Sequence, residues 1–186
     1  MLGRHAAANA LAAIAVARAM RMNEDEIVSA LSAAPGPDMR LQLEEFGGVV
    51  VLNDAYNANP NSMRAALETL KNIARDGRRI AVLGDMRELG QTSDHYHHEV
   101  GQFAAKCGLD LLVCVGTQAV QIAEAAQRSG MTASAIRKFS DAESASKELP
   151  RWLREGDMVL LKASRAIHLE NVALAIAESR RMKMAS

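Results

Sequence analysis

From residue 40 onward, short runs rich in Val, Ile and Leu alternate with longer stretches of helical character. Such runs are typical of buried strands, and the intervening stretches are long enough for crossover helices. We expect strands over 40–46, 48–55, 79–84, 110–115, 135–139 and 157–162, and helices over 60–75, 93–107, 117–129, 141–154 and 166–181. The first two strands form a hairpin turning at Gly47 and Gly48, and the others pair in parallel. The pattern predicts an α/β fold, a doubly wound, Rossmann-like and mostly parallel sheet with helices on both faces.

The first 35 residues follow a different pattern. Residues 3–20 are strong helix formers whose apolar positions run nearly all round the helix, so this helix needs burial on several sides. A second helix opens at Asn23 with Glu26 three residues on, a capping-box arrangement, and "PGPD" at 35–38 ends it. We expect residues 1–35 to form a helical unit without a sheet of its own, and residues 36–186 to form the α/β domain.

Charge and cysteine content narrow the possible functions. The 186 residues include 22 Lys plus Arg and 22 Asp plus Glu, so no long-range field recruits nucleic acid or a membrane surface. Cys107 and Cys114 lack the paired spacings of zinc sites and disulfide frameworks, which favours two reduced thiols. The Ala-rich start, interrupted by Arg18 and Arg21, matches neither a signal peptide nor a membrane span. We therefore expect a cytoplasmic protein with a small-molecule site.

Parallel sheets bind ligands outside the carboxyl ends of their strands, and four loops of this sequence lie there. They are "NDAYNANP" (53–60), "GDMRELGQTSD" (84–94), "GTQA" (116–119) and "KASRAIHLE" (162–170). The first, second and fourth are unusually rich in polar side chains, which indicates that the site lies among these three.

The first loop combines turn residues with residues that a turn does not require. Asp54 and Asn57 follow a strand end, where a carboxylate can accept two hydroxyl hydrogen bonds, as acidic residues do with ribose; an Asx-turn explains the position equally well. Asn59 and Pro60 suit the N-cap and first position of a helix. Arg40, at the junction of the two parts, could clamp a phosphate or be an ordinary exposed arginine.

The loop "GDMRELG" offers a second group of candidates. Gly84 could let the backbone approach a ligand closely, with Asp85 and Arg87 at the mouth of the site. A loop carrying a solvated charge pair is the alternative.

The loop "KASRAIHLE" places Ser164 at a strand-to-helix turn, with a helix expected to begin directly after it. Lys162, Arg165 and His168 would then gather positive charge at a helix N-terminus, where a carboxylate binds well. Ser164 could also be a simple N-cap, and the basic side chains could be solvated flanks.

Histidines give weaker signals. His5 and Asn9 lie four apart on one helical face and could touch a common partner, although a satisfied core histidine is commoner. The histidines of "DHYHH" (94–98) cannot all face one way on a helix, so we expect a solvated helical face there and no metal ligands. The sequence contains no P-loop pattern and therefore no evident triphosphate cradle.

Four motifs in this order, "GRHAAANALAA", "DAYNANPNSM", "LGDMRELG" and "KASRAIHLE", resemble the Mur ligase superfamily. Within it, they are most similar to the branch that joins D-alanyl-D-alanine to a UDP-N-acetylmuramoyl-tripeptide. The first motif resembles the last helices of the family's central ATPase domain, and residues 36–180 resemble its C-terminal Rossmann-like domain. The sister branch has a histidine between the tyrosine and the proline and an Asp-Asn-Pro-Arg element, both absent here. The family's "HN" is His5-Ala6 in this chain, which leaves Asn9 as the amide.

The resemblance implies ATP-driven amide formation with Mg²⁺. The tripeptide carboxylate would become an acyl phosphate, which the amine of D-alanyl-D-alanine attacks. By resemblance, Asp54 holds the ATP ribose, Arg40 reaches the terminal phosphate, and His5 and Asn9 lie by the adenine. The resemblance implies that five residues bind the peptide substrates: Asn57, Asn59, Asp85, Ser164 and Arg165. The catalytic residues, the UDP-sugar domain, the phosphate loop, the magnesium ligands and the family's modified lysine are expected in the N-terminal and central domains, which this sequence lacks.

Two other function classes stay open at this stage. A non-catalytic nucleotide or small-molecule binding module would share the fold, but it would not need Arg40 at a junction or an apolar helix without a sheet. A pure interaction domain predicts no polar focus at the strand ends. We expect the chain alone to be inactive toward ATP, and we expect helix 3–20 to present an apolar patch that folds back or drives self-association.

Overall fold

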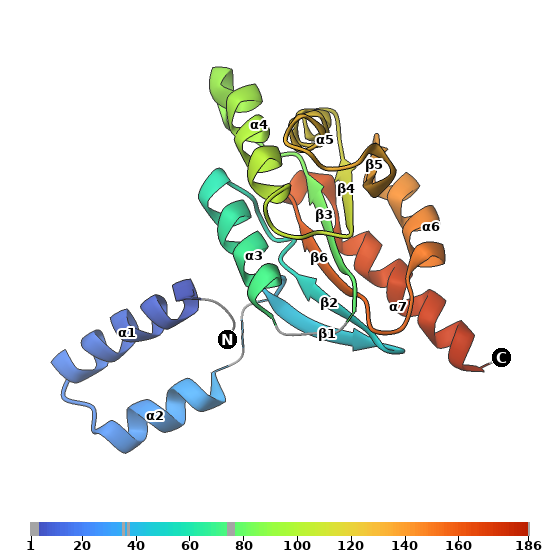
Figure 1. Ribbon diagram of the computed structural model, residues 1–186. Coiled ribbons are helices and arrows are strands. Elements are labelled where there is room, and N and C mark those ends of the chain that lie inside the picture. Colours follow the sequence, from blue (N-terminus) through green and yellow to red (C-terminus); the bar gives the residue numbers. More distant parts are fainter. Residues whose placement is uncertain (1–3, 35, 37, 74–76, 186) are drawn as a thin grey trace.

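The computed structural model describes residues 4–34, 36, 38–73 and 77–185, with side chains placed between residues 7 and 183 of these ranges. A six-stranded sheet forms the middle layer of the larger part of the molecule (Figure 1). Its strands are β1 (Gln42–Phe46), β2 (Val49–Asn53), β3 (Arg79–Gly84), β4 (Leu111–Val115), β5 (Ile136–Phe139) and β6 (Met158–Lys162). Each lies within the predicted range or at most two residues from its bounds, so the predicted strands are confirmed.

The strand order is β1-β2-β6-β3-β4-β5, which the sequence alone did not give. The hairpin of β1 and β2 is antiparallel, and β2, β6, β3, β4 and β5 run parallel. The last strand is thus inserted between β2 and β3, and the carboxyl ends of β2, β6 and β3 are adjacent. This order brings the loop after β2 next to the loop after β6.

Helices cover both faces of the sheet, as predicted. The helices α3 (Pro60–Asn72), α4 (Ser93–Ala104) and α5 (Ala119–Arg128) bury apolar side chains on one face, and α6 (Ala142–Trp152) and α7 (Glu170–Ala185) do so on the other. Single 3₁₀ turns lie at η1 (Gly90–Thr92), η2 (Ala133–Ala135) and η3 (Arg165–Ile167). Alternate residues of each central strand contribute to the two cores, because successive side chains of a strand point to opposite faces. The predicted end of the first crossover helix, at residue 75, falls outside the described residues.

Two predicted boundaries are wrong for a backbone reason. Leu41 has a φ of 49°, so the first strand begins at Gln42 and not at residue 40. The helix expected directly after Ser164 does not begin there, because His168 adopts the left-handed conformation with a φ of 57°. One 3₁₀ turn therefore follows Ser164, and α7 begins at Glu170.

The helices α1 (Arg4–Ala19) and α2 (Glu24–Ala33) form a pair that stands beside the layered part of the molecule (Figure 1). The predicted capping box is present, since the Asn23 side chain accepts from the Glu26 N–H and the Glu26 carboxylate accepts from the Asn23 N–H. Among the apolar side chains of this pair, Leu11 and Val16 are 66% and 60% exposed. Apolar side chains of the pair are thus exposed, as expected, and a continuous patch stays a prediction.

Candidate functional site

A buried ion pair joins the loop after β2 to the end of β6. The Lys162 Nζ lies 2.5 Å from the Asp54 Oδ2 and donates a second hydrogen bond of 3.0 Å to the Asn57 carbonyl oxygen. The other carboxylate oxygen, the Asp54 Oδ1, accepts from the Leu41 N–H at 3.1 Å. The lysine side chain is 3% exposed and that of the aspartate 13% exposed, so little water reaches the pair. Lys162 is therefore a buried charge, and the solvated-flank interpretation of it is wrong.

The environment of Lys162 also changes its acidity. Burial lowers the pKa of the ammonium group because the charged form loses hydration, whereas the Asp54 carboxylate raises this pKa, and the positive charge of Arg40 lowers it further. The net effect is a lowered pKa.

Arg40 lies on the exposed side of this pair. Its guanidinium stacks over the ring of Tyr56, 4.5 Å from the ring centroid. The backbone on either side is strained, since Met39 and Leu41 both have positive φ values, of 52° and 49°. Two hydrogen bonds stabilise this conformation: the Tyr56 N–H donates to the Met39 carbonyl, and the Leu41 N–H donates to Asp54. Arg40 is thus held at the carboxyl edge with its charge toward solvent.

The asparagines of the first loop have mostly local roles. The Asn59 Oδ1 accepts from the Ser62 N–H and the Ser62 hydroxyl accepts from the Asn59 N–H, so Asn59 caps α3 as expected, with Pro60 at its first position. The Asn57 Oδ1 accepts from the Ala58 N–H, and the Asn57 carbonyl holds Lys162. Both asparagines are exposed, and their side-chain NH₂ groups have no hydrogen bond within the described residues.

Asp85 binds a helix N-terminus. Its side chain is fully buried, and the Oδ1 accepts from the N–H groups of Gln118 and Ala119 at 2.9 and 2.7 Å, at the start of α5. The Oδ2 has no hydrogen-bond partner in the part of the chain that the structure describes, and the Arg87 Nη2 lies 3.6 Å away. A Cβ on Gly116 would overlap the carboxylate, which explains glycine there. Asp85 therefore anchors its loop. Its side chain is closed to solvent, whereas the predicted place at the mouth of a site would require it to be open.

Gly84 is explained by packing as well. A Cβ at this position would overlap the Ala163 side chain of the neighbouring strand end. The glycine therefore lets the ends of β3 and β6 approach each other. This packing explains a glycine at position 84 without the expected close approach of the backbone to a ligand.

Ser164 joins the loop after β6 to the loop after β3. Its hydroxyl oxygen accepts from the Arg87 N–H at 2.8 Å, and its own N–H donates to the Asp85 carbonyl at 3.0 Å. It makes no side-chain cap to η3, so the simple N-cap interpretation is wrong. Because Ser164 acts as acceptor toward Arg87, its hydroxyl proton remains to be donated.

Arg165 follows on the exposed side. Its Nη1 lies 3.0 Å from the Met39 Sδ and 3.4 Å from the Glu170 Oε1. Arg165 thereby lies beside the segment that carries Arg40. The structure thus gathers the predicted residues of the carboxyl edge: Arg40, Asp54, Asn57, Asn59, Asp85, Ser164 and Arg165.

Two predicted residues lie elsewhere. Asn9 is exposed on α1 and has no recorded contact with the carboxyl edge within the described residues. His5 belongs to α1, but its side chain lies outside the described ones.

Sequence reasoning missed His97. We expected a solvated helical face over 94–98, and His95 is exposed, but His97 is fully buried with both ring nitrogens hydrogen-bonded. Helical spacing could have found it, because His97 lies three residues before Val100 and seven before Ala104 on the buried stripe of α4. Its partner, the Met86 N–H, lies eleven residues earlier in a different loop.

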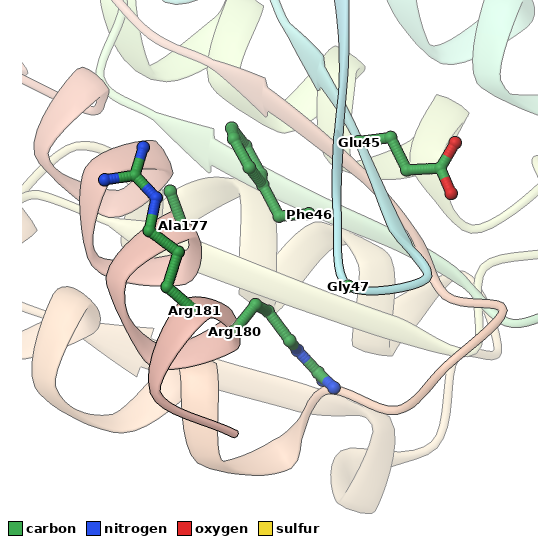
Figure 2. A pocket seen from close by; sticks show the side chains of 6 residues that line it. All are labelled: Glu45, Phe46, Gly47, Ala177, Arg180 and Arg181. Carbon is green, nitrogen blue, oxygen red and sulfur yellow. The ribbon is translucent and has the colours of Figure 1, made fainter. Parts of the chain in front are cut away.

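A hollow lies away from this edge. It has a volume of about 330 Å³ between α7 and the β1–β2 turn, and it is lined by Glu45, Phe46, Gly47, Ala177, Arg180 and Arg181 (Figure 2). In Figure 2, Arg180 and Arg181 leave the helix in different directions. The Nε and Nη2 atoms of Arg180 are buried, and neither has a hydrogen-bond partner among the described residues. The contacts of the carboxyl-edge residues do not extend to this hollow.

The described ranges contain no group of three or more His, Cys, Asp or Glu side chains arranged to hold a metal ion. Among the same residues, no helix is both long and apolar enough to cross a membrane.

Residues 39–165 match the family described as "Mur ligase, glutamate ligase domain". The UDP-N-acetylmuramoyl-tripeptide–D-alanyl-D-alanine ligases of Bacillus subtilis and Mycobacterium tuberculosis (strain ATCC 25618 / H37Rv) are 31% and 38% identical to the chain over 180 and 194 residues. These matches cover 96% and 94% of the chain but only 39% and 38% of the relatives, so the chain spans less than two fifths of their length.

Solved structures agree with this similarity. A structure of MurF from Acinetobacter baumannii matches with a TM-score of 0.85 and 32% identity, over 95% of this chain and 38% of that one. MurF ligase from Thermotoga maritima, solved in complex with ADP, matches with a TM-score of 0.75 and 28% identity, over 91% of this chain and 37% of that one.

Proposed function

The chain belongs to the Mur ligase family, and from this premise we propose that it forms the C-terminal part of an ATP-dependent ligase that adds D-alanyl-D-alanine to a UDP-N-acetylmuramoyl-tripeptide. The relatives carry this activity in their names. The reaction would produce an acyl phosphate on the tripeptide carboxylate and then an amide bond with the dipeptide. We assign it to the cytoplasm, where both substrates and ATP would be available.

The observation that carries the proposal is the cationic carboxyl edge. Lys162 is the last residue of β6, Arg165 lies in the turn that follows it, and Arg40 lies in the segment before β1 that this turn contacts. Ligands of open α/β sheets bind at this edge, ATP is anionic, and the dipeptide carries a carboxylate. The edge lies within residues 39–165, which match the family.

On the nucleotide side, we assign Arg40 to the terminal phosphate and Asp54 to the ribose. Arg40 is exposed and its planar guanidinium suits a phosphate. Asp54 already accepts from Lys162 and from the Leu41 N–H, and a carboxylate has further lone pairs, so a ribose hydroxyl would bind at the part of it that is still exposed. The assignment of His5 and Asn9 to the adenine depends on the family resemblance alone.

On the dipeptide side, we assign the Ser164 hydroxyl and the Arg165 guanidinium to the carboxylate of D-alanyl-D-alanine. The hydroxyl has a proton to donate, and the guanidinium is half exposed. The side-chain NH₂ groups of Asn57 and Asn59 lie on the same edge and would donate to peptide carbonyls. Asp85 enters the proposal as a residue that holds this edge and does not touch substrate.

We further propose that residues 1–35 belong to the central domain of the whole enzyme. The exposed apolar side chains of α1 and α2, such as Leu11 and Val28, would then be covered by the remainder of that domain. In the separate chain, the same patch would favour self-association. The phosphate loop, the magnesium ligands and the UDP-sugar site would come from the remainder of the enzyme, so the chain alone should not ligate. No step is assigned to a metal ligand of this chain.

A hybrid enzyme tests the proposal. Residues 1–186 would replace the matching C-terminal part of the Bacillus subtilis ligase, and ATP-dependent joining of D-alanyl-D-alanine would be measured by release of ADP and formation of the product. Arg40→Ala should raise the KM for ATP, and Ser164→Ala should raise that for the dipeptide, by roughly tenfold each if one charge-assisted hydrogen bond is lost. Arg128→Ala, at an exposed position on α5, is the matched control.

The competing function is a nucleotide-binding module without ligase activity. A folded hybrid that binds ATP but forms no product, under conditions where the Bacillus subtilis enzyme is active, would favour that alternative.

A further inference from the structure

His97 lies on α4, fully buried, and both of its ring nitrogens are hydrogen-bonded to the backbone. The Nε2 is 2.9 Å from the Met86 N–H, which can only donate, so this ring nitrogen is the acceptor. The Nδ1 therefore carries the proton and donates to the Ser93 carbonyl at 2.8 Å. These contacts determine one neutral tautomer.

The hydrogen bond from Met86 fixes the Asp85–Met86 peptide group, which immediately precedes the peptide group that carries the Arg87 N–H. Met86 is itself buried, and the next N–H along the chain, that of Arg87, donates to the Ser164 hydroxyl at 2.8 Å. The preceding residue, Asp85, accepts from the Ser164 N–H and is anchored to α5. The loop is therefore held by α4, by α5 and by the loop after β6.

This arrangement determines how Ser164 is presented. Because the Arg87 N–H occupies a lone pair of the Ser164 hydroxyl, the serine proton must point to another acceptor. The same peptide places the Arg87 side chain, 54% exposed, at the carboxyl edge. A rotation of the Met86–Arg87 peptide would release both groups.

We propose that His97 is a positioning residue for the ligand-binding edge. It acts through the Met86 N–H to hold the Arg87 N–H against the Ser164 hydroxyl, so that the serine proton and the Arg87 guanidinium face an incoming carboxylate. The identity of that carboxylate, the D-alanyl-D-alanine terminus, rests on the proposed function. The positioning itself does not.

Two variants with amide side chains distinguish the hydrogen bonds of the two ring nitrogens. In His97→Gln, the amide oxygen reaches the place of the Nε2 and can still accept from the Met86 N–H. In His97→Asn, the shorter side chain reaches only the place of the Nδ1, so the Ser93 contact can persist while the Met86 N–H loses its acceptor. His95→Gln, at a position 68% exposed, is the matched control.

Amide hydrogen exchange on the 186-residue chain is the first measurement. Protection of the Met86 and Arg87 N–H groups should fall about tenfold in His97→Asn, as expected for one buried hydrogen bond of ordinary strength, and should stay near the native value in His97→Gln. Protection of the Val113 N–H in the central strand β4 should change much less. An equal loss at all three amides would mean a merely structural role and would overturn the proposal.

The ring itself is the second measurement, made on the native chain so that it does not depend on any variant folding. The ¹⁵N shifts of the His97 imidazole should show a protonated Nδ1 and an unprotonated Nε2. The opposite tautomer would overturn the proposal.

Titration with D-alanyl-D-alanine is the third measurement. Binding should shift the Arg87 and Ser164 signals and weaken about tenfold in His97→Asn, with recovery in His97→Gln. If the dipeptide shifts no signal of the native chain, the proposed substrate is wrong, whereas the exchange and tautomer results still decide whether His97 positions the loop. Undiminished dipeptide binding by His97→Asn would overturn the positioning role.

Discussion

Replacing Asp54 by Asn removes the charge that faces Lys162 while leaving the shape of the side chain nearly unchanged. The ammonium group is 2.5 Å from the carboxylate and its side chain is only 3% exposed, so water cannot take the place of the lost partner. Removing one member of a buried ion pair costs about 3 to 5 kcal/mol, because it leaves an uncompensated charge. The Asn oxygen can still accept from the Leu41 N–H, so the cost comes chiefly from the charge. This is a large part of a typical domain stability of about 5 to 15 kcal/mol.

The destabilisation should depend on pH in a defined direction. Burial already lowers the pKa of Lys162, and loss of Asp54, which raises this pKa, lowers it further. Between the folded-state pKa and the ordinary value of 10.5, the unfolded chain binds more protons than the folded chain, so stability rises with pH in that window. The window is wider in Asp54→Asn. The difference in the free energy of unfolding between Asp54→Asn and the native chain should therefore be largest near neutral pH and shrink as the pH approaches 10.5.

The assay is urea unfolding of the chain, followed by circular dichroism, for Asp54→Asn, Lys162→Met and the double variant. The double variant should be more stable than Asp54→Asn alone, because an apolar side chain then replaces the unpaired ammonium. Glu124→Gln, which breaks an exposed ion pair on α5, should leave the midpoint unchanged. A loss below about 1 kcal/mol for Asp54→Asn at neutral pH, or a double variant no more stable than it, would refute the reasoning.

Three further predictions concern residues away from this pair. Gly116→Ala should destabilise the chain by about 3 kcal/mol or more in urea unfolding, because the added Cβ would overlap Asp85 and the φ of this residue is 115°. Gly108→Ala should cost only about 1 to 2 kcal/mol, because Gly108 has a φ of 66° but open space around it. Equal losses in the two variants would contradict the overlap argument. Arg180→Met should leave the unfolding free energy unchanged or raise it by up to about 4 kcal/mol, because two buried guanidinium nitrogens lack partners, and a clear loss would mean that the charge is compensated. Burial raises the pKa of the Cys114 thiol, so this residue should react with a disulfide reagent at pH 8 only after unfolding, and fast reaction of the native chain would show that it is accessible.

The order of strands and helices could be predicted because it depends on local patterns. Runs such as "VVVLN" are buried on both faces in the structure, as their continuous apolar character indicates. The caps at Asn23 and Asn59 were also predictable, since a capping box is complete within four residues. That the polar loops meet at one edge of the sheet followed from the rule for parallel strands. The individual roles of Asp85 and Ser164 did not, because both depend on partners in distant loops.

The sequence by itself therefore determined the α/β class, the hairpin at Gly47 and Gly48, the alternation of elements and the polar loops at the strand ends, since these depend on residues close together in the chain. The tertiary structure alone decided that β6 lies between β2 and β3, and thereby that Lys162 meets Asp54 across 108 residues. Strand order depends on which faces and edges bury best against one another, and a linear pattern does not encode this. The same packing decided that His97, one of three neighbouring histidines, is buried and accepts a hydrogen bond from the Met86 N–H.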